Sequence, residues 1–331
     1  MTHLVAVTGA EGFIGSHLVE ALVERGSRVR AMVQYNSFAS WGWLETLDPD
    51  VLEMVDVVLG DVRDPDSVRG LMEDAEVVYH LAALIAIPYS YEAPRSYLAT
   101  NAGGTVNVLE AARALGTPRV VHTSTSEVYG TARQVPIDET HPLQAQSPYA
   151  ASKVAADKFA ESYRLSFDLP VVTLRPFNTF GPRQSARAVI PTIISQIAAG
   201  EREIRLGSLA PTRDFCFVAD TAGAFLAVGA ADAGAVLGET FNAGTGVEIS
   251  IGDLVEAIAE VMGEEVQVRC EESRLRPDAS EVMRLVADPR KLELATGWRP
   301  LHTLPEGLEI ACEWFQDPVN LSRYRTAVYT V

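Results

Sequence analysis

The feature that most constrains the fold is a glycine-rich turn near the N-terminus, between a short apolar stretch and an amphipathic one. Residues 3–8 have the apolar pattern of a buried strand, and residues 16–25 continue with helical spacing. Between them, Gly9, Gly12 and Gly15 form a Gly-x-x-Gly-x-x-Gly turn. Glycines at this spacing permit the tight turn and let backbone N–H groups approach a pyrophosphate at the positive end of the helix. The motif therefore predicts a dinucleotide-binding α/β domain.

The rest of the chain continues this alternation of strand and helix. Apolar strands are predicted at 28–33, 55–59, 77–80, 119–123 and 171–174, and another near 239–242 is expected to return to the same sheet. This order predicts an α/β fold with a Rossmann-type doubly wound parallel sheet. We expect residues 1–177 and the returning segment 236–246 to form the dinucleotide-binding domain. Residues 178–235 and 247–331 are expected to form a smaller C-terminal substrate-binding lobe over the carboxyl ends of the strands.

A second motif, Tyr149-x-x-x-Lys153, places a phenol and an ammonium one helical turn apart on the same face of a predicted helix. A free phenol titrates near pKa ~10, and a neighbouring cation stabilises the phenolate and brings it toward a working range. Upstream, Thr125 offers a hydroxyl, and Glu127 adds a carboxylate that can remove or deliver a second proton. The motif alone is common on exposed helix faces, so its meaning depends on the glycine-rich turn that accompanies it.

Taken together, these segments resemble the extended short-chain dehydrogenase/reductase family of nucleotide-sugar enzymes over essentially the whole chain. Further matching pieces are Gly60-Asp61-Val62, His80-Leu81-Ala82-Ala83, the segment 101–105, the segment 175–183 and Arg213-Asp214-Phe215. The resemblance implies that Asp61 and Val62 meet the adenine, and that the backbone of residues 81–83 lines the cofactor. His80 is equally well interpreted as a hydrogen-bonded structural histidine, and Asn101 as a residue that pins a helix.

The motifs and the resemblance predict three sets of site residues. The catalytic set is Thr125, Ser126, Glu127, Tyr149 and Lys153. The cofactor-binding set is Gly9, Gly12, Phe13, Ile14, Gly15, Gln34, Tyr35, Asp61, Val62, Leu81, Ala82, Ala83, Tyr149 and Lys153. The substrate-binding set, which would hold a nucleotide-diphosphate sugar, is Asn178, Arg183, Arg187, Arg213 and Arg276.

The triplet Thr125-Ser126-Glu127 bears on the reaction. Epimerases of the family usually carry a small residue where Glu127 stands, so the triplet favours the dehydratase and decarboxylase branches. The chain most resembles the bacterial GDP-N-acetylglucosamine 4,6-dehydratases of the legionaminic-acid pathway, through the segments 34–38, 41–42, 84–90, 181–187 and 274–277. This resemblance implies oxidation at C4 with Tyr149 as base, elimination of water across C5 and C6 with Glu127 as both base and acid, and reduction at C6. The alternatives are a UDP-glucuronate decarboxylase, an NDP-sugar 4-epimerase and a non-catalytic NAD(P)-sensing regulator.

The end of the second strand bears on the choice of cofactor. Many NAD-dependent members place Asp or Glu there, where it binds the ribose 2′-hydroxyl. Here the strand ends Val33-Gln34-Tyr35-Asn36, with no carboxylate to repel a 2′-phosphate and no arginine directly after it to attract one. We predict NAD, with NADP as the alternative.

Composition excludes several classes of partner. The net charge of -17 argues against nucleic acid, which is bound mainly by neutralising its phosphates. The three cysteines form no Cys-x-x-Cys pair, so neither zinc nor a disulfide framework is expected. No apolar stretch is long enough to span a bilayer and no signal peptide is recognised, so we expect a cytoplasmic protein without membrane contact. The predicted helical stretches 93–115 and 148–167 resemble helices that pair across a two-fold axis in the family, which predicts a homodimer.

Overall fold

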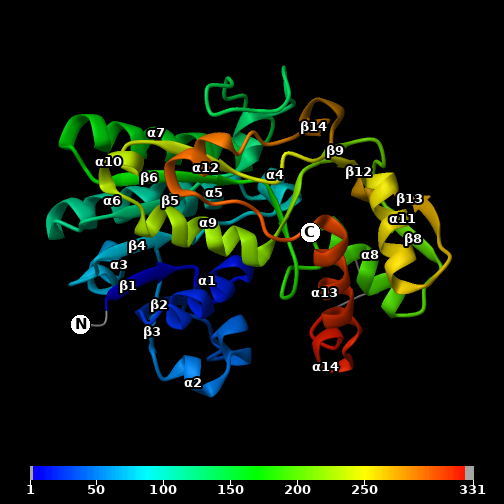
Figure 1. Cartoon of the computed structure of the whole chain (residues 1–331), viewed down its shortest axis with the longest axis horizontal. Helices are drawn as coiled ribbons and strands as arrows, with labels where there is room; N and C mark the ends of the chain where they lie inside the picture. Colours follow the sequence, from blue (N-terminus) through cyan, green and yellow to red (C-terminus); the bar gives the residue numbers. More distant parts are fainter. Residues whose placement is uncertain (1–2, 325–331) are drawn as a thin grey trace.

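A single parallel sheet organises the computed structural model, which describes residues 3–324. Its strands are β1 (Leu4–Thr8), β2 (Arg28–Gln34), β3 (Val55–Gly60), β4 (Val77–His80), β5 (Val120–Thr123), β6 (Val171–Pro176) and β11 (Thr240–Ala243). They lie in the order β11-β6-β5-β4-β1-β2-β3, and every neighbouring pair is parallel (Figure 1). The Rossmann-type doubly wound fold is therefore confirmed, and β11 returns to the sheet in the segment where the sequence predicts a strand.

Alternation along the strands explains the two helical layers. Val5 and Val7 of β1 join the core that contains α1 (Phe13–Glu24) and α9 (Val218–Ala230). Ala6, between them, points to the opposite core, which contains α3 (Pro65–Met72), α6 (Gly104–Leu115) and α7 (Pro148–Phe167). Because successive side chains of a strand point to opposite faces, an all-apolar strand such as β1 needs helices on both sides.

The stretch predicted as one helix over residues 93–115 is a continuous rod with a π-helical middle. It consists of α5 (Pro94–Tyr97), the π-helical segment η2 (Leu98–Gly103) and α6. Asn101 in this segment accepts a hydrogen bond from the Leu84 N–H at 2.8 Å and donates to the Leu84 carbonyl at 2.9 Å. Its side chain also donates to Ser152 Oγ at 2.9 Å, so Asn101 ties the segment after β4 to α7.

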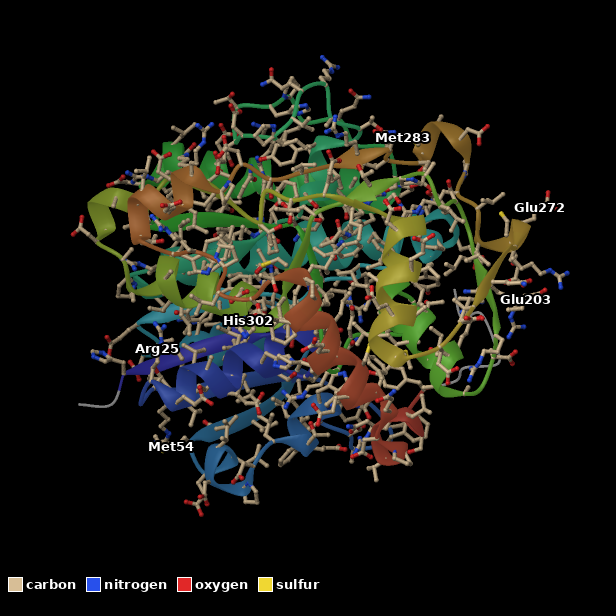
Figure 2. The ribbon with its side chains drawn as sticks, turned by 45° about the vertical axis from the view of Figure 1, so that its right-hand side comes forward. Arg25, Met54, Glu203, Glu272, Met283 and His302 are labelled. Carbon is tan, nitrogen blue, oxygen red and sulfur yellow. The ribbon has the colours of Figure 1, made fainter. Side chains whose placement is uncertain are left out.

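A second core forms the smaller lobe. It is built from α8 (Val189–Ala198), α11 (Ile251–Met262) and α13 (Leu304–Gln316), with β8 (Glu203–Leu206) paired to β13 (Gln267–Cys270). β7 (Asn178–Phe180) pairs with β10 (Phe215–Phe217), and β9 (Thr212–Arg213) lies between β12 (Ile249–Ser250) and β14 (Arg284–Leu285). Figure 2 shows Glu203 and Glu272 at the outer end of this lobe, across the molecule from Arg25 and Met54. The division into two domains at the stated boundaries stays a prediction.

Short helices complete the chain. They are η1 (Gly42–Thr46), α2 (Pro49–Leu52), α4 (Ile87–Glu92), η3 (Ser126–Tyr129), α10 (Ala233–Val236), η4 (Glu272–Arg274), η5 (Asp278–Ser280), α12 (Arg290–Thr296) and α14 (Pro318–Leu321). Within residues 3–324, no helix has both the length and the apolar character needed to cross a membrane. In the same range, no cluster of three or more His, Cys, Asp or Glu side chains is arranged to hold a metal ion.

Candidate active site

The glycine-rich turn is closely packed at two of its three glycines. Gly9 has a φ of +68°, and a β-carbon added there would lie 2.8 Å from the backbone nitrogen of Ala82. A β-carbon on Gly15 would collide with the Gly9 carbonyl oxygen. Gly12 is the N-cap of α1, and the nearest atom to an added β-carbon there is the Gly9 oxygen at 3.3 Å. Gly9 and Gly15 therefore hold the turn together, whereas Gly12 leaves the N-terminus of α1 open to a ligand.

Neighbouring residues of the predicted cofactor set support this turn. Phe13 and Ile14 begin α1 and pack against the core of the smaller lobe. The Thr8 hydroxyl oxygen accepts hydrogen bonds from the backbone N–H groups of Leu81 and Ala82, both at 3.1 Å. The chain leaving β4 is thus fixed beside the turn, and its contact with a dinucleotide stays a prediction.

The end of β5 and the first turn of α7 bring the catalytic set together. Ser147 caps α7 by accepting a hydrogen bond from the Ala150 N–H at 3.1 Å, which places Tyr149 in the first helical turn. The Tyr149 hydroxyl is hydrogen-bonded to Thr125, and Thr125 in turn accepts a bond from the Glu127 N–H at 3.2 Å. Lys153 Nζ donates to the Thr123 carbonyl at 2.6 Å. Phenol, hydroxyl, carboxylate and ammonium therefore share one buried site, with Ser126 buried at the start of η3.

The pKa of Tyr149 is raised, whereas the sequence predicts that a neighbouring cation lowers it. Burial raises the pKa of its phenol above the ordinary value, the hydrogen bond from Thr125 opposes this, and the negative charge of Glu127 adds to it. The Lys153 ammonium is directed at the Thr123 carbonyl. Burial lowers the pKa of Lys153 to about 8, with Asp157 opposing the shift. Within the described residues, these surroundings therefore raise the pKa of Tyr149 and favour its neutral form.

Arg213, which is buried, and Arg276, which is partly exposed, form a cationic wall near the carboxylate of Glu127. Burial lowers the pKa of Arg213, and the nearby charge of Glu127 opposes that shift. Glu281 lies between the two guanidinium groups, 3.4 Å from Arg213 Nη2 and 3.5 Å from Arg276 Nη1. Arg276 Nη1 and Asn178 Oδ1 are both buried without a hydrogen-bond partner in the described chain. A guanidinium nitrogen that makes no hydrogen bond, beside an acceptor that receives none, fits a phosphate-containing ligand with adjacent hydroxyl groups.

Two other arginines of the predicted substrate set have different surroundings. Arg183 forms a bidentate pair with Glu20 of α1, at 2.6 and 3.1 Å, and so joins the two lobes. Arg187 is exposed, and its charge acts on Tyr97, whose pKa burial raises to about 12. The ligand-binding roles of Arg183 and Arg187 stay predictions.

The residues predicted to meet the adenosine lie near the ends of β2 and β3. Asp61 pairs with Arg63. Val62 is buried in the core on the α6 side of the sheet, and Gln34 and Tyr35 are exposed at the end of β2. Their contacts with a cofactor also stay predictions.

A polar network behind the site was not foreseen from the sequence. Asp157 accepts hydrogen bonds from His122 Nε2 at 3.1 Å, Ser124 Oγ at 2.8 Å and Arg175 Nη2 at 2.9 Å. These contacts and the neighbouring charges lower the pKa of Asp157 to about 2 although burial alone would raise it. Arg175 continues the network to the Tyr129 hydroxyl at 2.9 Å. The available signal was the spacing, because Asp157 follows Lys153 by one turn of the same helix.

His80 is the structural histidine that the sequence allowed. Its Nδ1 bonds Thr8 Oγ1 at 2.9 Å and its Nε2 bonds Thr105 Oγ1 at 3.0 Å. Burial lowers its pKa well below the usual value, so the ring is neutral. His80 therefore braces β4 against α6, with both of its ring nitrogens occupied.

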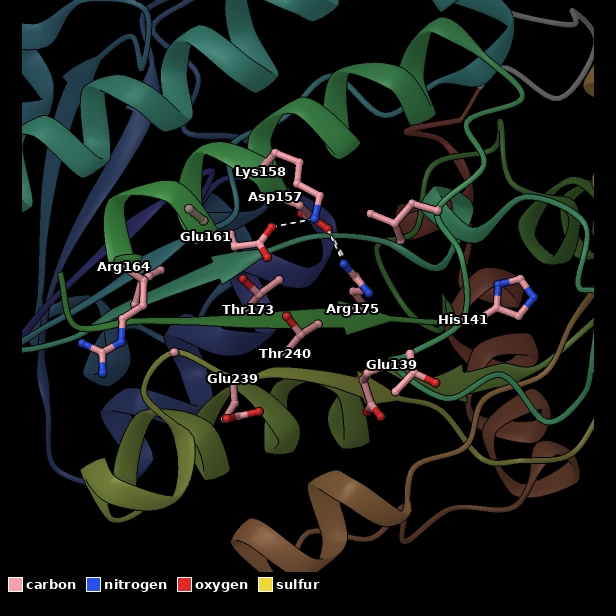
Figure 3. A pocket seen from close by; sticks show the side chains of 15 residues that line it. Glu139, His141, Asp157, Lys158, Glu161, Arg164, Thr173, Arg175, Glu239 and Thr240 are labelled. Atoms are coloured by element: carbon pink, nitrogen blue, oxygen red, sulfur yellow. Dashed lines mark hydrogen bonds and ion pairs between the residues drawn. The ribbon is translucent and has the colours of Figure 1, made fainter. Parts of the chain in front are cut away.

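A polar cavity of about 310 Å³ lies over β6 and β11, beside α7 (Figure 3). Its lining includes Asp157 and Arg175 from the buried network and the exposed pair Lys158 and Glu161. Thr125, Glu127, Tyr149 and Lys153 are not among its lining residues. The cavity therefore opens onto the outer end of the network and is separate from the acid–base site.

Comparison with known proteins agrees with this geometry. The family model described as GDP-mannose 4,6 dehydratase matches residues 6–311. A UDP-glucose 4-epimerase of Mycolicibacterium smegmatis is 36% identical, over 94% of this chain and 98% of its own length. The human dTDP-D-glucose 4,6-dehydratase is 31% identical, over 95% of this chain and 90% of its own.

Solved structures show the same likeness. A UDP-glucose 4-epimerase of Thermus thermophilus in complex with NAD has a TM-score of 0.83 at 30% identity, covering 95% of this chain and 99% of that one. The dTDP-glucose 4,6-dehydratase DesIV of Streptomyces venezuelae, with NAD and TYD bound, has a TM-score of 0.82 at 28% identity, covering 95% and 97%. The chain therefore belongs to the GDP-mannose 4,6-dehydratase family, among the nucleotide-sugar dehydratases and epimerases of the short-chain dehydrogenase/reductase type.

Proposed function

We propose that this chain is an NAD-dependent nucleotide-sugar 4,6-dehydratase. It would convert an NDP-hexose, with GDP-N-acetylglucosamine as the candidate substrate, to the 4-keto-6-deoxy sugar. The observation that carries the proposal is the buried carboxylate of Glu127, beside Tyr149 and Thr125 and facing Arg213. NAD is supported by the open N-terminus of α1 at Gly12 and by the NAD complexes of the Thermus and Streptomyces relatives.

The residues divide the proton chemistry between them. When bound, the nicotinamide would supply the hydride chemistry, accepting hydride from C4 and returning it at C6, and the positive charge of its oxidised form would favour the phenolate of Tyr149. Tyr149 accepts the proton of the O4 hydroxyl, and Thr125 holds that oxygen through its own hydroxyl. Once C4 is a ketone, the C5 proton is acidic enough for Glu127 to remove, and Glu127 would then deliver it to the C6 hydroxyl, which leaves as water. As hydride returns to C6, C5 takes up a proton and Tyr149 gives up the proton that it took from O4, so both side chains end as they began.

Substrate recognition would rest on the cationic wall. In this proposal Arg213 and Arg276 bind the diphosphate, and Asn178 and Arg187 bind the ribose or the sugar. Glu281 now occupies both arginines. When the diphosphate binds, its oxygens would replace the Glu281 carboxylate at one of them and form a charge-assisted hydrogen bond there. The smaller lobe would thereby hold the nucleotide over the carboxyl ends of the strands, with Arg183 joining it to α1.

We also propose a homodimer formed through α7 and the rod that contains α6. Leu98, Phe159, Leu165 and Phe167 are large apolar side chains that these elements expose. An apolar face of this kind is stabilised when a second copy covers it across a two-fold axis. Light scattering of the purified protein would test the assembly.

A 4-epimerase is the second candidate, because the Mycolicibacterium relative at 36% identity bears that description. An epimerase needs the same Tyr149 and Lys153, but it returns hydride to C4 and leaves the C5 proton in place. A decarboxylase also oxidises C4 and instead loses C6 as carbon dioxide. Transfer of the C4 hydride to C6 therefore identifies the dehydratase, and loss of C6 as carbon dioxide separates the decarboxylase from the epimerase.

The test is an incubation of the enzyme and NAD with GDP-, UDP-, dTDP- and CDP-sugars, including GDP-N-acetylglucosamine, read by mass spectrometry. A dehydratase product has lost one water; with substrate deuterated at C4 the label moves to C6 of the same molecule, and in D₂O solvent deuterium enters at C5. Label retained at C4 with the C6 hydroxyl intact would establish the epimerase instead.

Glu127→Gln isolates the elimination step. The amide is nearly isosteric but cannot take the C5 proton, so the variant should reduce the cofactor on substrate and then stall, with the absorbance of reduced nicotinamide accumulating. Glu161→Gln, an exposed change on α7, is the matched control and should behave as wild type. Normal turnover by Glu127→Gln would contradict the assigned role of this carboxylate.

A further inference from the structure

The carboxylate of Glu11 lies at the end of β2, although Glu11 belongs to the glycine-rich turn. Its Oε1 accepts a hydrogen bond from the backbone N–H of Gln34, the last residue of β2, at 3.0 Å. The parallel pairing of β1 and β2 explains this reach, because Thr8 lies opposite Met32 and the Ala10 N–H donates to the Met32 carbonyl at 3.3 Å. The turn after β1 therefore runs directly beside the exit of β2.

The second carboxylate oxygen of Glu11, Oε2, has no hydrogen-bond partner within the described chain, although it is buried. Burial raises the pKa of Glu11, and backbone hydrogen bonds from Gln34 and from its own N–H oppose the shift. A buried carboxylate oxygen without a donor is costly, so a ligand hydroxyl placed there would be strongly favoured.

The segment after β2 packs on Glu11. The Trp43 N–H donates to the Glu11 carbonyl at 3.0 Å. Gly42 has a φ of +58°, and a β-carbon added to it would lie 2.8 Å from the Glu11 backbone oxygen and 3.0 Å from the Glu11 β-carbon. Gly42 and Trp43 thus pack on the backbone and the β-carbon of Glu11. Because Oε2 is buried, a ligand reaches it only when a neighbouring group moves aside.

We propose that Glu11 supplies the carboxylate that β2 lacks: its Oε2 accepts the 2′-hydroxyl of the adenosine ribose of NAD and excludes the 2′-phosphate of NADP. A carboxylate at the end of the second strand performs this selection in many dinucleotide folds. In this chain the carboxylate belongs to the glycine-rich turn, so the second strand can end in Gln34 while NAD is still preferred over NADP. A phosphate dianion beside a buried carboxylate would be repelled with little screening by water.

The proposal rests on the proposed function only in taking a dinucleotide as the ligand of the glycine-rich turn. The test measures binding, so it does not depend on dehydratase activity. Isothermal titration of the protein freed of cofactor with NAD, NADP, ADP-ribose and 2′-phospho-ADP-ribose gives the ratio of affinities directly. Wild type should prefer NAD over NADP by about 100-fold, because a hydrogen bond to a charged group is worth about 2 to 3 kcal/mol.

Glu11→Gln keeps an acceptor for the Gln34 N–H but replaces the charged oxygen by an amide donor. The preference for NAD should fall by about 10-fold or more, with NADP binding more tightly than in wild type. Adding Gln34→Asp to this variant places a carboxylate at the end of β2 and should restore the preference for NAD. Glu45→Gln, an exposed change in the same segment, is the control and should leave the ratio unchanged.

An equal loss of affinity for both dinucleotides in Glu11→Gln would overturn the proposal, since a merely structural carboxylate acts on both alike. Wild-type affinity for NADP equal to that for NAD would also overturn it. If Glu11→Gln does not fold, Glu11→Ala must show the same change of ratio. Failure of wild type to bind any of the four compounds would instead refute the proposed cofactor site.

Discussion

Replacing Lys153 by methionine should stabilise the folded protein at neutral pH while abolishing catalysis. Lys153 is 3% exposed, and its pKa is lowered from 10.5 to about 8, chiefly by burial. A change of one in pKa corresponds to about 1.4 kcal/mol, so keeping the ammonium charged in the folded state costs about 3 kcal/mol. Methionine loses the hydrogen bond to the Thr123 carbonyl, worth about 1 kcal/mol. The expected increase in the free energy of unfolding is therefore about 2 kcal/mol.

The pH dependence follows from the same shift. Below the folded-state pKa of about 8, Lys153 is charged in both the folded and the unfolded protein, and its full cost is present. Between about 8 and 10.5 the unfolded protein binds more protons, so wild-type stability rises with pH relative to the methionine variant. At the upper end of this range Lys153 is neutral in the folded protein, so the cost of burying its charge is gone, while its hydrogen bond to the Thr123 carbonyl remains. Wild type should then be more stable than the methionine variant by about 1 kcal/mol.

Urea unfolding near neutral pH and at about pH 10 measures both differences. Lys158→Met on the same helix is the control: Lys158 is exposed and pairs with Glu161, so its effect should stay within about 0.5 kcal/mol at both pH values. Groups distant from Lys153 titrate alike in the compared proteins and cancel in the difference. A Lys153→Met protein that is less stable than wild type at neutral pH, by an amount that does not change with pH, would refute the reasoning.

Two further substitutions test the site. Gly12→Val should abolish NAD binding in calorimetry while the circular dichroism spectrum is kept, because Gly12 has a φ of -78° and only the Gly9 oxygen, at 3.3 Å, near an added β-carbon; unchanged NAD affinity would contradict the turn as a pyrophosphate site. Tyr149→Phe should lower turnover by roughly 10² or more with little change in substrate affinity, because the acid–base oxygen is lost. Tyr163→Phe, farther along α7, is its control, and near wild-type turnover of Tyr149→Phe would make Tyr149 a packing residue.

Local patterns were sufficient for the fold and for the motif residues. Short apolar runs located every strand of the main sheet, since a strand buried on both faces is apolar over most of its length. The spacing of Tyr149 and Lys153 placed them on one face of α7, and the structure brings Thr125 and Glu127 to the same site. Each of these inferences depends on residues a few positions apart, where backbone geometry fixes the relation between side chains.

The effects of burial and the contacts between residues far apart in the chain could not be predicted from the sequence. The pKa of Tyr149 is raised, not lowered, chiefly because the phenol is buried, and Glu127 and Tyr97, the latter from another helix, add to the shift. The hydrogen bond from Tyr129 to Asn242 joins residues 113 positions apart, and no periodicity connects them.

Glu11 shows the same limit most clearly. The end of β2 lacks a carboxylate in the sequence, yet the fold places one there from the preceding turn, through the bond to Gln34 at 3.0 Å. Periodicity and turn chemistry are properties of neighbouring residues, so the sequence by itself determined the sheet, the glycine-rich turn and the Tyr149 motif. The electrostatics of a site depend on which distant groups exclude water and donate hydrogen bonds, and only the tertiary structure decided those.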